Sequence, residues 1–200
     1  MHIVTLLTNP ADPKLDLATA SALRDAWGGA EITWLSPDEA AEFAIPAIPA
    51  NRWDVWESLQ QQGVDLVIQP AGGRRKKMLI ADMDSTMIQQ ECIDELAEVA
   101  GVGAHVRDIT ARAMNGELDF EGALSERVAL LAGLDAGVID RVIADRITFM
   151  PGGAALLKTM KANGAYTVLV SGGFTAFTGH VAAHLGFDEA RANTLLMENG

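Results

Sequence analysis

The 200-residue sequence predicts an α/β fold in which a small leading module precedes a larger domain built on a parallel β-sheet. Short apolar runs alternate with helix-periodic segments along most of the chain. Two of these runs, at 78–81 and 166–170, lack the apolar–polar alternation of a half-exposed strand, so we expect strands that are covered on both faces. Turn residues and four consecutive bases at 69–77 predict a boundary between the two parts.

The composition is that of a globular protein, with 49% hydrophobic and 21% charged residues. It excludes a disordered chain, a collagen-like repeat and a disulfide scaffold. The net charge is −12, and an acidic surface repels phosphate backbones and anionic headgroups, so we expect neither nucleic acid nor a membrane as partner. The single Cys92 and the absence of a basic region ahead of a long apolar run predict a cytoplasmic protein.

Residues 1–72 are expected to form a small α/β domain. Strands are expected at 3–7, 32–35 and 64–68, and helices at 16–27 and 53–62. A further short helix is expected after Ser36-Pro37-Asp38-Glu39, because a capping serine, a proline and two acids are typical of a helix N-terminus. Residues 73–77 are then a basic linker; the alternative interpretation of its charges is a patch that steers phosphates.

The second domain, 78–200, carries most of the negative charge. Its 8 basic and 17 acidic residues give a net charge of −9, whereas residues 1–77 have 7 and 10, a net charge of −3. After the strand at 78–81, helical patterns extend from 89 to 147, with breaks at 101–103, 115–116 and 133. A helix at 154–163 then leads to the strand at 166–170. We therefore expect a helical insertion between two strands of the sheet.

Two carboxylates follow the first of these strands directly. Residues two apart in an extended chain point the same way, so Asp82 and Asp84 are expected to face one site at the carboxyl end of the strand. Such a pair repels unless a cation lies between the two groups or one is protonated. With Mg²⁺, which prefers oxygen ligands, one carboxylate can attack phosphorus while the other handles the proton of the leaving group. An aspartate-rich turn that caps a helix is the alternative interpretation.

The second buried strand ends in a complementary motif. Ser171-Gly172-Gly173-Phe174-Thr175 offers a hydroxyl and an unencumbered backbone at the start of a helix, where free N–H groups and the helix dipole suit a phosphate. With about 85 residues between them, the two motifs together resemble motifs I and II of the haloacid dehalogenase-like (HAD) phosphatase superfamily. Segments 82–97 and 114–128 are similar to the phosphoserine phosphatases in particular. The first 70 residues resemble only loosely the ACT-type domain that precedes the catalytic domain in some of these enzymes.

The resemblance implies a Rossmann-like core with a parallel sheet in a three-layer α/β/α arrangement, and a helical cap at about 89–147 inserted after the first strand. The resemblance also implies catalytic or binding roles for individual residues. Asp82 is the nucleophile, which forms an aspartyl-phosphate and binds Mg²⁺. Asp84 is the general acid and then the general base, and its backbone carbonyl is a metal ligand. Ser171 and Gly172 hold the phosphoryl oxygens, where negative charge must be met by fixed donors.

Residues of the helical insertion are implied to select the substrate. Glu91 matches an acid that binds the substrate ammonium, and Arg127 matches an arginine whose bidentate fork binds the substrate carboxylate. Met114 and Phe120 match apolar positions that close over the substrate and exclude water. For Glu91 and Arg127 alone, the alternative interpretation is a solvated pair of charges on helix faces.

The implied function is hydrolysis of O-phospho-L-serine to L-serine and phosphate, the last step of serine biosynthesis. One alternative is a phosphotransferase or phosphatase that acts on another small amino-acid phosphomonoester. Another is a catalytically inactive amino-acid-binding protein, if the chain truly ends at residue 200. The oligomeric state stays open, with a homodimer among the options.

Two parts of the family pattern have no match in the sequence: a lysine that pairs with the nucleophile, and a later Gly-Asp-Gly-x-Asn-Asp turn that completes the Mg²⁺ site. After Ser171 the chain has no lysine, and its only acids are Asp188, Glu189 and Glu198. We therefore expect these 200 residues to be the front part of a longer enzyme, with little or no activity on their own.

Other chemically capable residues are expected to be structural. His180 and His184 lie four apart on a predicted helix, but no acid or cysteine completes a zinc set with them. Cys92 is expected to pack in the core rather than to act as a nucleophile.

Overall fold

The computed structural model describes residues 1–200, which divide into two compact units, Met1–Arg75 and Lys76–Gly200. The division falls inside the run of four bases, and Arg74 forms an ion pair with Glu42 of the first unit. Each unit has its own hydrophobic core. None of the helices combines the length and the hydropathy that a membrane crossing needs.

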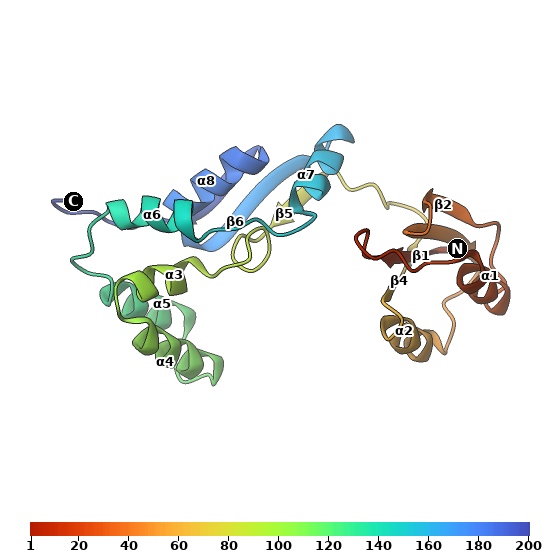
Figure 1. The fold of residues 1–200 in the computed structure, drawn as a ribbon, viewed down its shortest axis with the longest axis horizontal. Coiled ribbons are helices and arrows are strands. Elements are labelled where there is room, and N and C mark those ends of the chain that lie inside the picture. Colours follow the sequence, from red (N-terminus) through yellow and green to blue (C-terminus); the bar gives the residue numbers. More distant parts are fainter. The chain divides into compact units, whose positions relative to one another are not determined.

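The first unit is a four-stranded antiparallel sheet with two helices (Figure 1). Its elements are β1 (His2–Thr8), α1 (Leu17–Ala26), β2 (Thr33–Ser36), β3 (Ala40–Ile45), α2 (Arg52–Gln60) and β4 (Val64–Pro70). The strand order across the sheet is β2-β3-β1-β4. Val4 and Phe43 from the strands pack in one core with Leu23 and Leu59 from the helices. The likeness of this unit to an ACT-type domain stays a prediction.

The segment after Ser36 is a hairpin turn and a strand, so the helix predicted there is wrong. The Ser36 hydroxyl donates to the Glu39 carboxylate at 2.8 Å, and Asp38 has a left-handed φ of 59°. Ala41, Phe43 and Ile45 are then buried at every second position, the period of a strand. Serine and aspartate side chains bond to nearby polar groups in turns as well as at helix ends, so their presence alone did not distinguish the two.

The second unit contains a three-stranded parallel sheet with the order β5-β6-β7, which confirms the predicted parallel strands (Figure 1). Four helices follow β5 (Met78–Ala81): α3 (Cys92–Val99), α4 (Gly103–Met114), α5 (Phe120–Ala129) and α6 (Gly137–Asp145). The remaining elements are α7 (Gly153–Ala162), β6 (Tyr166–Phe174), α8 (Thr175–Leu185) and β7 (Glu189–Asn193). Helices α3–α6 are therefore an insertion between the first two strands, and the gaps between them fall at the predicted breaks.

Only one face of the second sheet is covered by helices. Leu169 is fully buried, whereas Met78, Ile80 and Val170 on the other face are exposed, Ile80 by 64%. Because β5, β6 and β7 follow one another across the sheet in one direction, right-handed connections place α7 and α8 on the same face. The expectation of strands covered on both faces, and of three layers, is therefore wrong for the residues described.

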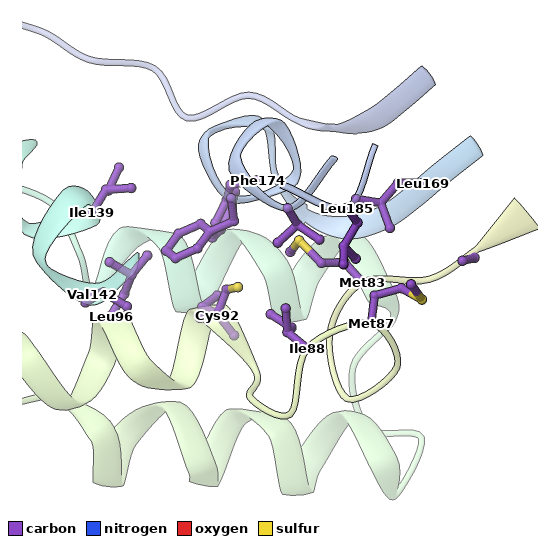
Figure 2. Packing of buried hydrophobic residues seen from close by; sticks show 14 of the residues in the cluster. Met83, Met87, Ile88, Cys92, Leu96, Ile139, Val142, Leu169, Phe174 and Leu185 are labelled. Carbon is purple, nitrogen blue, oxygen red and sulfur yellow. The ribbon is translucent and has the colours of Figure 1, made fainter. Parts of the chain in front are cut away.

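The helical insertion shares its core with the sheet. Leu96 of α3 and Val142 of α6 belong to the same cluster of buried side chains as Leu169 and Phe174 of β6 (Figure 2). Cys92 lies in this cluster and is fully buried, which confirms its packing role. Full burial of a valine, leucine or phenylalanine side chain contributes about 1.5–3 kcal/mol, so the cluster holds α3 and α6 firmly against the sheet.

Candidate active site

A cavity of about 240 Å³ lies where β5 ends, beside the last residues of β6. Its lining comes from three segments that are far apart in the sequence: Asp82, Asp84, Glu91 and Ile93; Phe120, Leu124 and Arg127; and Ser171, Gly172, Gly173 and Phe174. Seven of the eight site residues that the sequence predicts are among them. The fold therefore brings the two strand-end motifs and the two charged residues of the insertion to one place.

The two aspartates flank a buried residue. Met83 is fully buried, and its N–H donates to Asp82 Oδ1 at 2.7 Å. Asp84 Oδ1 accepts a weaker hydrogen bond, at 3.4 Å, from the N–H of Cys92 at the start of α3. With Met83 anchored in the core, both carboxylates line the cavity, although Asp84 already lies in the turn that follows β5.

Burial raises the pKa of Asp84 above its ordinary value. Hydrogen bonds from Cys92 oppose the rise, and the negative charges of Glu91 and Asp82 add to it. The protonated form of Asp84 is therefore easier to reach than that of a solvated aspartate. This property suits a group that must donate a proton and take it back.

The serine–glycine motif continues strand β6. β6 continues to Phe174, its ladder with β7 shifts between Val170 and Phe174, and α8 begins only at Thr175. The buried Ser171 accepts a hydrogen bond at Oγ from the Gly173 N–H at 2.9 Å. The hydroxyl proton of Ser171 therefore stays available for an anion in the cavity.

The two glycines let the backbone of β6 approach the opposite wall closely. A Cβ on Gly173 would lie 3.1 Å from both Asp84 Oδ2 and Ser171 Oγ. A Cβ on Gly172 would lie 3.2 Å from the ring of Phe120. Side chains at these positions would therefore crowd the aspartate or the aromatic ring, and glycine keeps the cavity open.

Two opposite charges project from the helical insertion into the cavity lining. Glu91 is the residue before α3, and its Oε1 accepts a hydrogen bond from the Ser85 hydroxyl at 2.7 Å. Arg127 lies in the last turn of α5, where its Nε donates to the Ala123 carbonyl at 3.2 Å. Neither residue takes part in an ion pair. The cavity therefore offers one unpaired carboxylate and one unpaired guanidinium.

Only one of the two apolar residues predicted for the site lines the cavity. Phe120, the first residue of α5, is 61% exposed but lines the cavity. Met114, the last residue of α4, is 84% exposed and does not line it. The structure therefore does not bring Met114 into the site, because α4 ends at this residue and its side chain lies in solvent.

Three apolar lining residues were not predicted. Leu124 lies four residues after Phe120 and three before Arg127 on α5, a helical spacing that could have indicated it. Ile93 lies in the first turn of α3, and Phe174 ends β6. Both belong to the hydrophobic core as well, so their apolar pattern could not separate lining from packing.

The residues present fit Mg²⁺ better than zinc. No cluster of three or more histidine, cysteine or acidic side chains has the spacing of a metal site. Mg²⁺ is usually held by one or two carboxylates together with waters and substrate phosphate oxygens, and the cavity lining includes two aspartates, Asp82 and Asp84. His184 stacks on Phe149, with ring centroids 4.1 Å apart, and has a packing contact there.

Residues 79–200 match the model of the haloacid dehalogenase-like hydrolase family. The chain belongs to this family. A phosphoserine phosphatase of Streptomyces coelicolor is 38% identical over 205 residues, which cover 99% of this chain and 50% of that protein. A phosphoserine phosphatase of Archaeoglobus fulgidus is 44% identical over 165 residues, which cover 80% of this chain and 48% of that protein. The chain thus spans about half the length of these curated HAD relatives.

Solved structures show the same family fold. A HAD family hydrolase from Salmonella enterica serovar Typhi is similar over 99% of this chain and 69% of its own, with a TM-score of 0.83 and 27% identity. A substrate-bound phosphoserine phosphatase is similar over 64% of this chain and 60% of its own, with a TM-score of 0.58 and 40% identity.

Proposed function

We propose that this protein is a phosphoserine phosphatase, which hydrolyses O-phospho-L-serine to L-serine and phosphate. The observation that carries the proposal is the pair of unpaired charges, Glu91 and Arg127, in one cavity with Asp82 and Asp84. An amino-acid phosphomonoester has an ammonium and a carboxylate beside its phosphate, so it needs one acid and one planar cation. The relatives named phosphoserine phosphatases support the same substrate.

In this proposal Asp82 is the nucleophile. One of its carboxylate oxygens forms a bond to phosphorus while the bond between phosphorus and the serine oxygen breaks, which leaves an aspartyl-phosphate. Asp84 gives its proton to the departing serine oxygen, and its raised pKa favours this role. Asp84 then takes a proton from the water that attacks the aspartyl-phosphate, which releases phosphate and restores both side chains.

The end of β6 is proposed to hold the phosphoryl group. The Ser171 hydroxyl and the Gly172 N–H donate to the phosphoryl oxygens, where negative charge develops during transfer. Asp82, through its carboxylate, and Asp84, through its backbone carbonyl, are proposed to hold Mg²⁺. When bound, Mg²⁺ neutralises charge on the phosphate and on the two carboxylates.

Helices α3–α6 are proposed to act as a cap over the site. Phe120 and Arg127 of α5 contribute to the cavity lining from this insertion. Movement of α5 toward β6 would exclude water and bring the guanidinium onto the substrate carboxylate. The same proposal includes a role in serine biosynthesis, a cytoplasmic location and an ACT-like first unit.

Phosphate release by the full-length protein from three substrates in the presence of MgCl₂ tests the function. O-phospho-L-serine carries both groups, O-phosphoethanolamine lacks the carboxylate, and the phosphate ester of 3-hydroxypropionate lacks the ammonium. We expect kcat/KM to be highest for phosphoserine by at least about tenfold, because each missing group leaves an unpaired charge in the cavity. Equal values for the three substrates would contradict an amino-acid phosphatase.

A substitution tests the nucleophile. Asp82→Asn should abolish turnover, since an amide cannot attack phosphorus in its place. Asp108→Asn is the matched control, because Asp108 is an exposed acid of α4 outside the cavity. Full activity of Asp82→Asn would contradict the proposed mechanism.

A further inference from the structure

The loop between β5 and α3 closes on itself at Ser85. The Ser85 N–H donates to the Gln90 carbonyl at 3.1 Å, and the Ser85 hydroxyl donates to Glu91 Oε1 at 2.7 Å. The residue next to Asp84 therefore contacts both residues at the far end of the loop. It joins the aspartate pair to the acid that precedes α3.

Ser85 holds this contact in a costly backbone conformation. Its φ is 52°, in the left-handed region, which costs a residue with a Cβ about 1–2 kcal/mol and costs glycine almost nothing. Serine thus stands where the backbone alone favours glycine. A bond made by its hydroxyl is a physical reason for the choice, and strained positions of this kind gather at functional sites.

The hydroxyl restricts a side chain that would otherwise be mobile. Glu91 is exposed, and a free glutamate populates several rotamers. A hydrogen bond from a hydroxyl to a carboxylate is charge-assisted and stronger than a neutral one. It engages Oε1 only, and Oε2 has no hydrogen-bond partner in the protein, while Glu91 lines the cavity. The bond therefore leaves one carboxylate oxygen for a ligand.

We propose that Ser85 is a positioning residue that holds Glu91 for the substrate ammonium and so strengthens the preference for amine-bearing substrates. Ser85 does not line the cavity, so it acts through Glu91. This inference rests on the proposed function, in which Glu91 binds the ammonium.

Two variants separate the hydroxyl from the backbone strain. Ser85→Ala removes the hydroxyl and keeps the strain, whereas Ser85→Gly removes both. We expect each variant to raise KM for O-phosphoserine about tenfold with little change in kcat, and to change KM for the phosphate ester of 3-hydroxypropionate less than about twofold. Thr86→Ala is the matched control, because the neighbouring hydroxyl makes no bond to Glu91.

A double variant tests whether Ser85 acts through Glu91. Once Glu91→Gln has removed the charge, adding Ser85→Ala should raise KM for phosphoserine no further. Additive increases would overturn the proposal. Equal losses on the substrates with and without an ammonium would also overturn it.

Crystal structures of the unaltered protein and of Ser85→Ala decide the proposal without any substrate. A Glu91 carboxylate that turns away from the cavity in the variant supports it, and an unchanged carboxylate overturns it. Failure of the unaltered full-length protein to hydrolyse phosphoserine would instead contradict the proposed function, and the two failures are thereby distinguished.

Discussion

Gln90 and Thr148 form a reciprocal hydrogen-bonded pair between the two segments that connect helices α3–α6 to the sheet. Gln90 Nε2 donates to Thr148 Oγ1 at 2.7 Å, and the Thr148 N–H donates to Gln90 Oε1 at 2.9 Å. Beside this pair, the Gln89 N–H donates to the Thr148 carbonyl at 2.9 Å, and Ile88 forms an antiparallel bridge with Phe149. The two connecting segments therefore form a short paired segment where the insertion joins the sheet.

Loss of the Gln90 side chain should loosen this paired segment. Gln90→Ala removes two hydrogen bonds, each worth about 0.5–1.5 kcal/mol, so we expect faster amide hydrogen exchange at Thr148 and Gln89. Gln61→Ala, at an end of α2 in the first unit, should leave these rates unchanged. Unchanged exchange in Gln90→Ala would show that the core cluster alone holds the insertion.

Arg127 should select substrates by their carboxylate. Arg127→Ala is expected to raise KM for phosphoserine by about tenfold or more and to have little effect on O-phosphoethanolamine, which has no carboxylate to bind. Arg127→Lys should recover part of the loss, because an ammonium keeps the charge without the bidentate fork. Arg141→Ala on α6, outside the cavity, is the control. Equal losses on the two substrates would assign Arg127 another role.

The two glycines of β6 should respond differently to a methyl group. Gly173→Ala places a Cβ 3.1 Å from Asp84 Oδ2 and Ser171 Oγ, so we expect Asp84 to shift and kcat to fall about tenfold or more. Gly172→Ala meets only the exposed ring of Phe120 at 3.2 Å, which can move aside, so its effect on kcat should be smaller. Steady-state kinetics of both variants measure this, and the reverse order would contradict it.

Asp188 should make the stability of the second unit sensitive to acid. Lys161 Nζ lies 2.6 Å from its Oδ1, and the Thr167 hydroxyl and N–H donate to Oδ2 at 2.8 and 2.9 Å. These contacts, with Lys161 first, lower the pKa of Asp188 from 3.8 to about 2. Its contribution to stability is therefore complete above the ordinary pKa and is lost as pH falls from about 4 to 2.

Asp188→Asn tests this dependence. Across that range the variant should lose less stability than the unaltered protein, as measured by urea unfolding at a series of pH values, because it has no proton to take up at this site. Asp108→Asn, which removes an exposed acid, should behave like the unaltered protein. The same loss in Asp188→Asn and the unaltered protein would contradict the assignment.

Much of the fold follows from local patterns in the sequence, and the exceptions have physical causes. The strands at 78–81 and 166–170 are short apolar runs bounded by polar residues, and the structure contains both. β3 was expected to be helical because Ser36 and Asp38 suit helix ends and turns equally, and only pairing with β1 settles the choice. The exposure of Ile80 depends on which face the connections cover, a property of the whole sheet.

The site could likewise be predicted from the sequence only in part. Asp82, Asp84 and Ser171 follow from their places at strand ends, whereas Glu91 and Arg127 depended on a family resemblance. The Gln90–Thr148 pair joins residues 58 apart, and the Ser85 hydroxyl reaches Glu91 only because of a left-handed backbone. No periodicity encodes such contacts, which arise when the insertion folds back onto the sheet.

The covalent state of Asp82 during turnover tests the central claim most directly. The full-length protein is mixed with O-phospho-L-serine and MgCl₂, quenched in acid within the first turnover, digested and examined by mass spectrometry. The account predicts a transient phosphoryl group on Asp82 that disappears as phosphate is released, and none in Asp82→Asn. Turnover of phosphoserine with no phosphoryl group on Asp82, or with one on another residue, would contradict it.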